Sequence, residues 1–181
     1  QTEAKAEDAK AEDTKAETEA AKDEAASGEK HLVGVAMPTK DLQRWNQDGS
    51  NMKAELEAAG YEVDLQYASN DVQTQVSQVE NMISNGCELL VIASIDGSSL
   101  GEPLGQAKEA GIPVISYDRL LMNSDAVTYY ATFDNYMVGQ KQGEYLVEAL
   151  GLEENDGPFN IEMFTGDPAD NNCNFFFGGA M

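Results

Sequence analysis

The residues LVGVAM at positions 32–37 decide the fold, together with two similar runs further along the chain, LLVIA at 89–93 and PVISY at 113–117. Each run is short, apolar and rich in β-branched side chains, which is typical of a strand buried on both faces. Between these runs, apolar residues recur at helical spacing. Strands and helices that alternate with short connections predict an α/β fold, in which a mostly parallel sheet carries helices on both faces.

The same alternation continues to the end of the chain. The expected strands are residues 32–37, 61–67, 89–93, 113–117, 127–132 and 159–164. The expected helices are residues 48–59, 70–85, 100–110, 138–150 and 171–181. In open parallel sheets, ligands bind beyond the carboxyl ends of the strands. We therefore expect functional side chains directly after the strands.

Charge and hydropathy exclude several classes of protein. The 181 residues hold 33 acidic and 11 basic side chains, which gives a formal charge of −22. Such a surface repels phosphate backbones and anionic lipid headgroups, so we expect no nucleic-acid partner and no docking on a membrane surface. No apolar run reaches the roughly 18 residues that span a bilayer. A small neutral ligand is compatible with this charge.

Residues 1–30 differ in composition from the rest of the chain. They contain ten acids and five lysines, but no aromatic residue and no Leu, Ile, Val or Met. With no apolar side chains to bury, this segment cannot offset the entropy of ordering. We interpret residues 1–30 as an acidic Ala/Glu/Lys low-complexity tether. The folded part begins at His31.

The usual motifs of enzymatic and metal chemistry are missing from the sequence. It contains no G-x-G-x-x-G turn, no G-x-x-x-x-G-K-[ST] phosphate loop and no nucleophile elbow. His31 is the only histidine, and Cys87 and Cys173 are far apart in the sequence, so zinc would lack ligands. We therefore expect a protein that is not an enzyme and that holds no metal and no cofactor.

Polar side chains follow the first, fourth and sixth expected strands. Arg44 and Trp45 come after the first, where a Trp ring can stack on the apolar face of a pyranose and Arg can donate to hydroxyls. Asp118 and Arg119 follow the fourth and can grip neighbouring hydroxyls. Asn172 follows the sixth, with an amide that both donates and accepts. The alternatives stay open: Trp45 is a core residue and Arg44 a surface charge, Asp118 and Arg119 pair with other charges, and residues 170–172 form a helix cap.

Taken in order, these residues resemble a known family. The motifs that carry the resemblance are RW at 44–45, QVENMI at 78–83, LLVIA at 89–93, YDR at 117–119, FDN at 133–135 and DNN at 170–172. Each motif is short, but the ordered set is specific and the likeness covers residues 32–181. The chain resembles the periplasmic sugar-binding proteins of ABC importers, in the xylose-binding and multiple-sugar-binding branch.

The resemblance implies a type I periplasmic-binding-protein fold, in which two Rossmann-like lobes close on a sugar. Residues 31–132 would form the N-terminal sugar-binding lobe. Residues 133–181 would form only the beginning of a similar C-terminal lobe, so we expect the natural chain to continue beyond Met181.

The resemblance also implies a role for each candidate residue. By position, Arg44 would hydrogen-bond the sugar and Trp45 would stack on it. Asp118 and Arg119 would bind ring hydroxyls from the first lobe, and Asn172 would do so from the second. No cofactor or metal is required by this family pattern.

The implied function is that of an extracytoplasmic solute-binding protein. It would capture a monosaccharide of the xylose, glucose, galactose or arabinose type and deliver it to an ABC transporter permease. The alternative is a sugar-sensing receptor domain that feeds a chemotaxis or two-component signalling partner. The acidic tether fits a periplasmic or cell-surface lipoprotein whose signal peptide ends at a lipidated cysteine, so an N-terminal lipid anchor would be the only membrane contact. We expect a monomer.

Overall fold

The computed structural model describes residues 31–181, and the tether predicted for residues 1–30 lies outside the described residues. Five strands form one sheet in the order β2-β1-β3-β4-β5, and all neighbouring strands are parallel. The strands are β1 (Leu32–Met37), β2 (Glu62–Tyr67), β3 (Leu89–Ile92), β4 (Val114–Tyr117) and β5 (Val127–Ala131). The first five predicted strands and the parallel α/β sheet are therefore confirmed.

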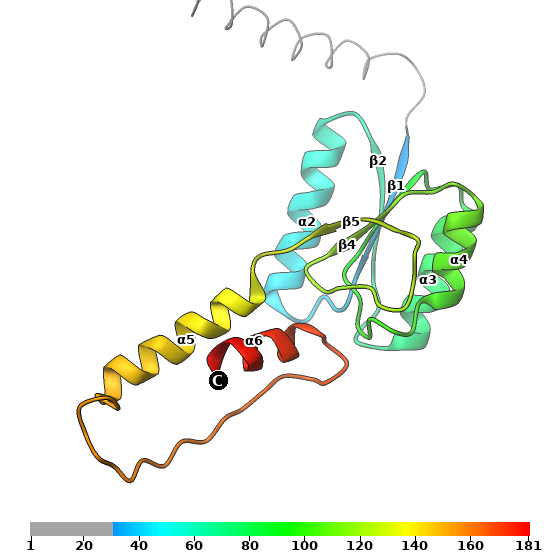
Figure 1. Ribbon diagram of the computed structural model, residues 1–181. Coiled ribbons are helices and arrows are strands. Elements are labelled where there is room, and N and C mark those ends of the chain that lie inside the picture. The colour runs from blue at the N-terminus through cyan, green and yellow to red at the C-terminus, as the bar shows by residue number, and fades with distance from the viewer. Residues whose placement is uncertain (1–30) are drawn as a thin grey trace, which may run out of the picture.

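Helices connect the strands and continue beyond them. They are α2 (Gln43–Ala58), α3 (Val72–Ser84), α4 (Gly101–Glu109), α5 (Asn135–Leu150) and α6 (Asn172–Ala180). Helix α2 covers one face of the sheet, and α3 and α4 cover the other (Figure 1). Within residues 31–181, no helix has both the length and the apolar character needed to cross a membrane.

The side chains of β1 are divided between two hydrophobic cores, one on each face of the sheet. Val33 lies in the same core as Trp45 of α2. Ala36 lies in the other core, together with Val79 of α3 and Leu104 of α4. Strand β1 is buried along nearly its whole length, which explains why its sequence is a continuous apolar run rather than an alternating one.

Helix α3 approaches β1 closely at Gly34. A Cβ placed on Gly34 would lie 2.8 Å from Met82 Sδ and 2.9 Å from Leu90 Cδ2. The close packing of helix and strand therefore requires a residue without a side chain at this point.

Helix α2 begins at Gln43 and not at Asp48, so the predicted start was wrong. The buried face of the helix already includes Trp45. Asp48 lies inside the helix, where its Oδ2 is 3.5 Å from Arg44 Nε one turn earlier. Asp is a common N-cap residue, but α2 begins after Leu42 without any side-chain cap.

Helix α5 also begins earlier than the predicted residue 138. The Asp134 carboxylate accepts a hydrogen bond from Met137 N at 2.9 Å. This side-chain cap satisfies a backbone donor of the first turn and fixes the start of the helix at Asn135.

The sixth strand, predicted at residues 159–164, is wrong. Residues 155–167 form neither helix nor strand, and Phe164 is 90% exposed. A strand needs a hydrogen-bonded neighbour, and the only sheet within residues 31–181 ends at β5 without reaching this segment. The apolar pattern is present in the sequence, but a pairing partner is not.

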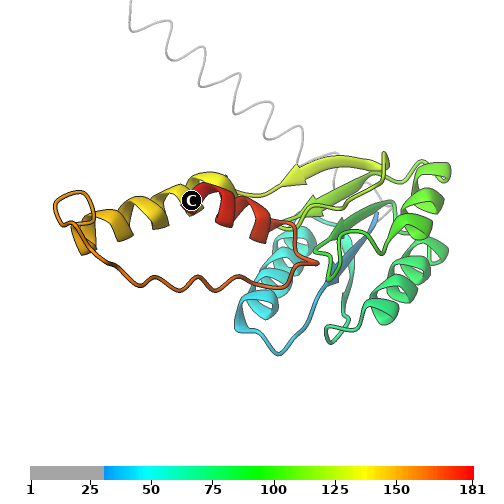
Figure 2. The same cartoon turned by 60° about the horizontal axis from the view of Figure 1, so that its bottom comes forward.

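Helices α5 and α6 pack against each other beyond the edge of the sheet, as both views show (Figure 1 and Figure 2). Their backbones are so close that a Cβ on Gly139 would overlap the carbonyl of Phe176. The segment 151–171 leads from the far end of α5 back to α6 (Figure 2). The lobe boundary predicted at residues 132–133 falls between β5 and α5 and stays a prediction.

Candidate functional site

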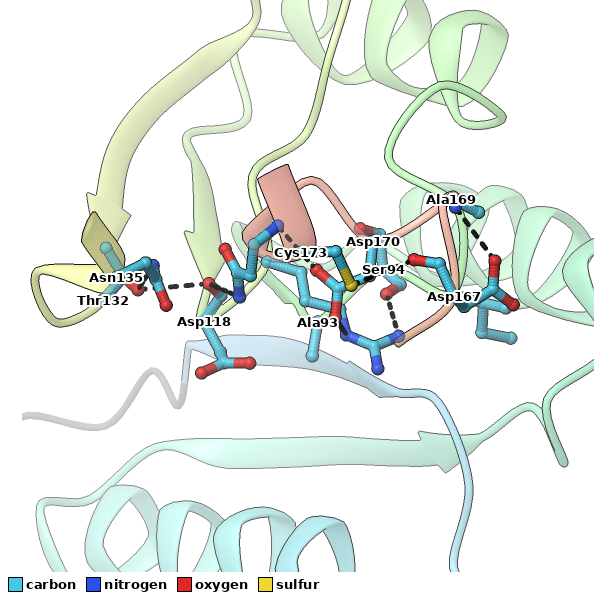
Figure 3. Close-up of polar contacts among 12 residues, drawn as sticks. Ala93, Ser94, Asp118, Thr132, Asn135, Asp167, Ala169, Asp170 and Cys173 are labelled. Carbon is cyan, nitrogen blue, oxygen red and sulfur yellow. Dashed lines mark hydrogen bonds and ion pairs between the residues drawn. The ribbon is translucent and has the colours of Figure 1, made fainter. Parts of the chain in front are cut away.

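The candidate site is centred on Asp118, the residue directly after β4. Asp118 has a φ of 60°, a left-handed conformation that Asp adopts more readily than most residues. Its carbonyl oxygen accepts hydrogen bonds from Tyr130 Oη, Thr132 Oγ1 and Asn172 Nδ2, each at 3.2 Å. Figure 3 shows this carbonyl directed toward Thr132, while the carboxylate points the other way. The backbone is thereby fixed, and the carboxylate faces different partners.

The Asp118 carboxylate pairs with Arg44 in the first turn of α2. Arg44 Nη2 donates to Asp118 Oδ1 at 2.5 Å. Partial burial by itself lowers the pKa of the Arg44 guanidinium, but the hydrogen bond and the charge of Asp118 outweigh it, so the net pKa is raised. The site therefore holds a permanent cation beside a buried acceptor.

Asp48 extends this pair along α2. Its Oδ2 accepts a hydrogen bond from Tyr117 Oη at 3.2 Å and also faces Arg44 Nε. Burial, followed by the charge of Asp48, raises the pKa of the Tyr117 hydroxyl. Tyr117 therefore stays a hydrogen-bond donor at neutral pH. The sequence signal for Asp48 is its spacing of four residues from Arg44 on one helix.

Arg119 lies beside Asp118 and is held from two directions. Its Nη1 donates to the Ser94 carbonyl, after β3, at 3.1 Å. Its Nε forms an ion pair with Asp170 Oδ2 at 3.0 Å. The guanidinium is mostly buried, with 23% of the side chain exposed, so it is a fixed donor group rather than a free surface charge.

Trp45 lies beneath both arginines. The guanidinium carbon of Arg44 is 4.5 Å from the ring centroid, and that of Arg119 is 5.3 Å away. Both distances suit a cation–π interaction. The ring is only 3% exposed and packs into the core on the α2 face of the sheet. Trp45 is therefore a core residue in this structure, and its stacking on a sugar stays a prediction.

Asn172 approaches Asp118 from the start of α6. It is buried, and its Oδ1 has no hydrogen-bond partner among the described residues. The Asn172 side chain does not act as a helix cap, because its amide donates to the Asp118 carbonyl. It is Asp170 Oδ1 that accepts the Asn172 backbone N–H, at 3.0 Å. Asn172 thus brings an unused acceptor into the site.

All five predicted site residues meet at the carboxyl edge of the sheet. They are Arg44, Trp45, Asp118, Arg119 and Asn172. Asp170 and Ser94, which hold Arg119, were not among the five predicted site residues. Asp170 belongs to the same DNN motif as Asn172, and Ser94 contributes a backbone carbonyl, which has no side-chain signal. Within residues 31–181, no cluster of three or more His, Cys, Asp or Glu side chains could hold a metal ion.

Residues 33–181 match the family model described as a periplasmic binding protein domain. The chain belongs to this family. It is 54% identical over 153 residues to the multiple sugar-binding periplasmic protein SbpA of Azospirillum brasilense, which covers 84% of the chain and 43% of that relative. It is 35% identical over 149 residues to the D-xylose-binding periplasmic protein of Escherichia coli K12, covering 82% of the chain and 43% of that relative.

A solved structure of the periplasmic binding protein family gives the same result for the fold. The ABC transporter solute-binding protein from Clostridium phytofermentans, with bound β-D-glucose, superimposes with a TM-score of 0.81 at 79% identity, over 83% of this chain and 46% of that one. The resemblance to the sugar-binding branch and the type I periplasmic-binding-protein fold are thereby confirmed. The chain spans less than half the length of these relatives.

Proposed function

We propose that this chain is part of an extracytoplasmic solute-binding protein that captures a monosaccharide and delivers it to an ABC transporter permease. The observation that carries the proposal is one connected set of side chains: two guanidinium groups lie over the Trp45 ring, the Asp118 carboxylate pairs with one of them, and the buried Asn172 amide bonds to the Asp118 carbonyl. A sugar presents hydroxyls that donate and accept, together with an apolar C–H face. The side chains at this edge of the sheet offer the complementary groups.

Each polar residue has one role in the proposal. Asp118 accepts from ring hydroxyls, and Arg44 and Arg119 donate to their oxygens. The Oδ1 of Asn172 adds an acceptor from the start of α6, which is supported by its burial without a partner among residues 31–181. A buried acceptor that lacks a partner costs free energy, so a ligand hydroxyl that donates to it contributes to affinity.

Stacking on Trp45 requires a guanidinium to move aside, because both arginines lie over the ring. Arg44 is the candidate to move, since 51% of its side chain is exposed. Arg119 is held by Ser94 and Asp170 and would keep its place. In the proposed complex, the sugar therefore displaces Arg44 from the ring face while Arg119 remains fixed.

The proposed mechanism is closure of two lobes. Residues 31–132 would belong to the first lobe and residues 133–181 to the second, with Asn172 reaching across to Asp118. A sugar that contacts both lobes stabilises the closed form, because its contacts with the second lobe exist only there. The mechanism breaks no covalent bond, so we propose neither enzymatic activity nor a cofactor or metal.

Localisation and partners follow from the same family. The names of the relatives support an extracytoplasmic location, and we extend this to a monomeric lipoprotein with an N-terminal lipid anchor. The bound β-D-glucose in the relative with 79% identity supports an aldose of the glucose type among the four predicted sugars.

Calorimetry on the complete protein tests the proposal with D-glucose, D-xylose, D-galactose and L-arabinose. We expect saturable one-to-one binding of at least one of them. No heat and no thermal shift with any of the four would defeat it. Permease and ATPase genes beside its own gene would support import, whereas a histidine kinase gene would favour the signalling alternative.

A further inference from the structure

We propose that Gln75 of α3 is a positioning residue for the sugar site, acting on Arg119 through the backbone at Ser94. The inference rests on the proposed function and adds to it a residue that touches no sugar. Gln75 is a fully buried glutamine in a helix whose other buried residues, Val79 and Met82, are apolar. A positioning role explains why a polar residue is buried there.

Gln75 uses both ends of its amide. Its Nε2 donates to the Ala93 carbonyl at 2.9 Å, and its Oε1 accepts from Ile95 N at 2.8 Å. The residue is 1% exposed. These backbone groups lie just after the end of β3, where the chain leaves the sheet. A buried peptide group needs a partner, and the glutamine amide supplies one donor and one acceptor, as a neighbouring strand would.

The residue between these two bonds is Ser94, whose carbonyl accepts from Arg119 Nη1. Because Gln75 holds the peptide groups on both sides of Ser94, it sets the direction of that carbonyl. The Ser94 hydroxyl has no hydrogen-bond partner among the described residues, so the backbone alone makes the connection. Ser94 and Asp170, the two residues that hold Arg119, are drawn in Figure 3.

The chemistry of the contact is specific to an amide. A side chain such as Met has a similar length but neither donates nor accepts, so it would leave the Ala93 carbonyl and the Ile95 N–H unsatisfied. Glu would keep the acceptor for Ile95 and lose the donor to Ala93 when ionised. The backbone at Ser94 would then adopt a different conformation, and Arg119 would lose the Ser94 carbonyl, one of its two fixed partners.

Gln78 provides a matched control on the same helix. It lies one turn further along α3, and its Nε2 donates to the Tyr67 carbonyl at the end of β2 at 3.1 Å. The hydrogen bond is of the same kind as those of Gln75, but it holds the Tyr67 carbonyl and not the backbone on either side of Ser94. Gln78→Met therefore removes a similar bond without reaching the proposed route.

The test is a double-mutant cycle in the complete protein, with affinity for the best-bound aldose measured by calorimetry. We expect Gln75→Met to raise Kd by about tenfold or more, and Gln78→Met by less than about twofold. In an Arg119→Met background, Gln75→Met should change Kd by less than about twofold, because the residue through which it acts is gone. Urea unfolding should show a larger loss of stability for Gln75→Met, which leaves two backbone groups unsatisfied, than for Gln78→Met, which leaves one.

An unchanged Kd in Gln75→Met overturns the inference. The inference is also overturned if Gln75→Met raises Kd by the same factor in the Arg119→Met background as in the unmodified protein. If Gln75→Met does not fold, Gln75→Glu takes its place with the same expected non-additivity. Failure of the unmodified protein to bind any aldose would instead refute the proposed function, and this inference with it. The two failures are therefore distinguishable.

Discussion

Arg44 and Asp118 are 74 positions apart in the sequence, and Arg44 Nη2 lies 2.5 Å from Asp118 Oδ1. The arginine comes from the first turn after β1, and the aspartate follows β4. The contact joins the first turn of α2 to the residue that follows β4, and the parallel sheet brings them together because the carboxyl ends of its strands share one edge. It places the acceptor and a donor of the proposed sugar site against each other.

Replacing Asp118 by Asn should weaken sugar binding. The change keeps the shape of the side chain but removes the charge that pairs with Arg44 and that would accept from ring hydroxyls. We expect Kd to rise by about tenfold or more in calorimetry. Asp125→Asn is the control, because Asp125 is an exposed partner of Lys108. Equal affinities for Asp118→Asn and the unmodified protein would contradict the assignment.

Asn172→Leu should also lower sugar affinity. The substitution removes the bond to the Asp118 carbonyl and the unpaired Oδ1 while keeping a similar volume. The expected loss is about tenfold in Kd, measured on the same sugar. Asn174→Ala serves as the control, since Asn174 is exposed and bonds only to Asn171. A loss of the same size in the control would point to a general effect on α6.

Gly34→Ala should destabilise the fold through core packing alone, because the residue lies outside the proposed sugar site. The new Cβ would meet Met82 Sδ and Leu90 Cδ2 at under 3 Å, and such overpacking costs about 1–3 kcal/mol in the free energy of unfolding. Gly105→Ala is the matched control in α4, where nothing lies within 4 Å of the added atom. We expect it to be neutral or to stabilise by up to about 1 kcal/mol. Urea denaturation measures both, and no loss for Gly34→Ala would contradict the packing.

The two cysteines should differ in reactivity. Burial, with a smaller contribution from the charge of Asp64, raises the pKa of the Cys87 thiol to about 11, so at pH 8 almost no thiolate forms there. Cys173 is only partly buried. A thiol reagent should therefore modify one cysteine in the folded protein and both after denaturation. Rapid modification of Cys87 at pH 8 would contradict its burial.

The same pKa shift makes a small contribution to stability with a defined sign. Because the folded state holds the Cys87 proton more tightly than the unfolded state, the contribution is fully present below the ordinary value of 9.0 and is lost as pH rises toward 11. Cys87→Ala should therefore flatten part of the alkaline fall in stability between those values, as followed by urea unfolding.

The sequence predicts the sheet well, because β1, β3 and β4 are short apolar runs and β2 alternates polar and apolar residues, patterns that need no knowledge of the neighbouring strands. It also predicts where the site lies, since functional side chains after parallel strands must share an edge. The segment 159–164 shows the limit: its apolar pattern is that of a strand, but pairing depends on a partner that the pattern does not contain. Similarly, the start of α2 at Gln43 depends on the burial of Trp45 and not on a capping residue.

The details of the site depend on contacts that no local pattern encodes. The burial of Trp45 beneath two guanidinium groups follows from packing across the sheet. The role of Ser94 lies in its backbone, and that of Gln75 becomes visible only when its two bonds to the β3 loop are known. Residue identity indicates the chemistry that is available, whereas the three-dimensional arrangement decides which residues use it.

A crystal structure of the complete protein with its best-bound aldose tests the central claim most directly. We expect sugar hydroxyls within hydrogen-bond distance of the Asp118 carboxylate, the Arg119 guanidinium and the Asn172 amide, with Arg44 moved off the Trp45 ring. A sugar whose polar contacts include neither Asp118 nor Arg119 would contradict the account.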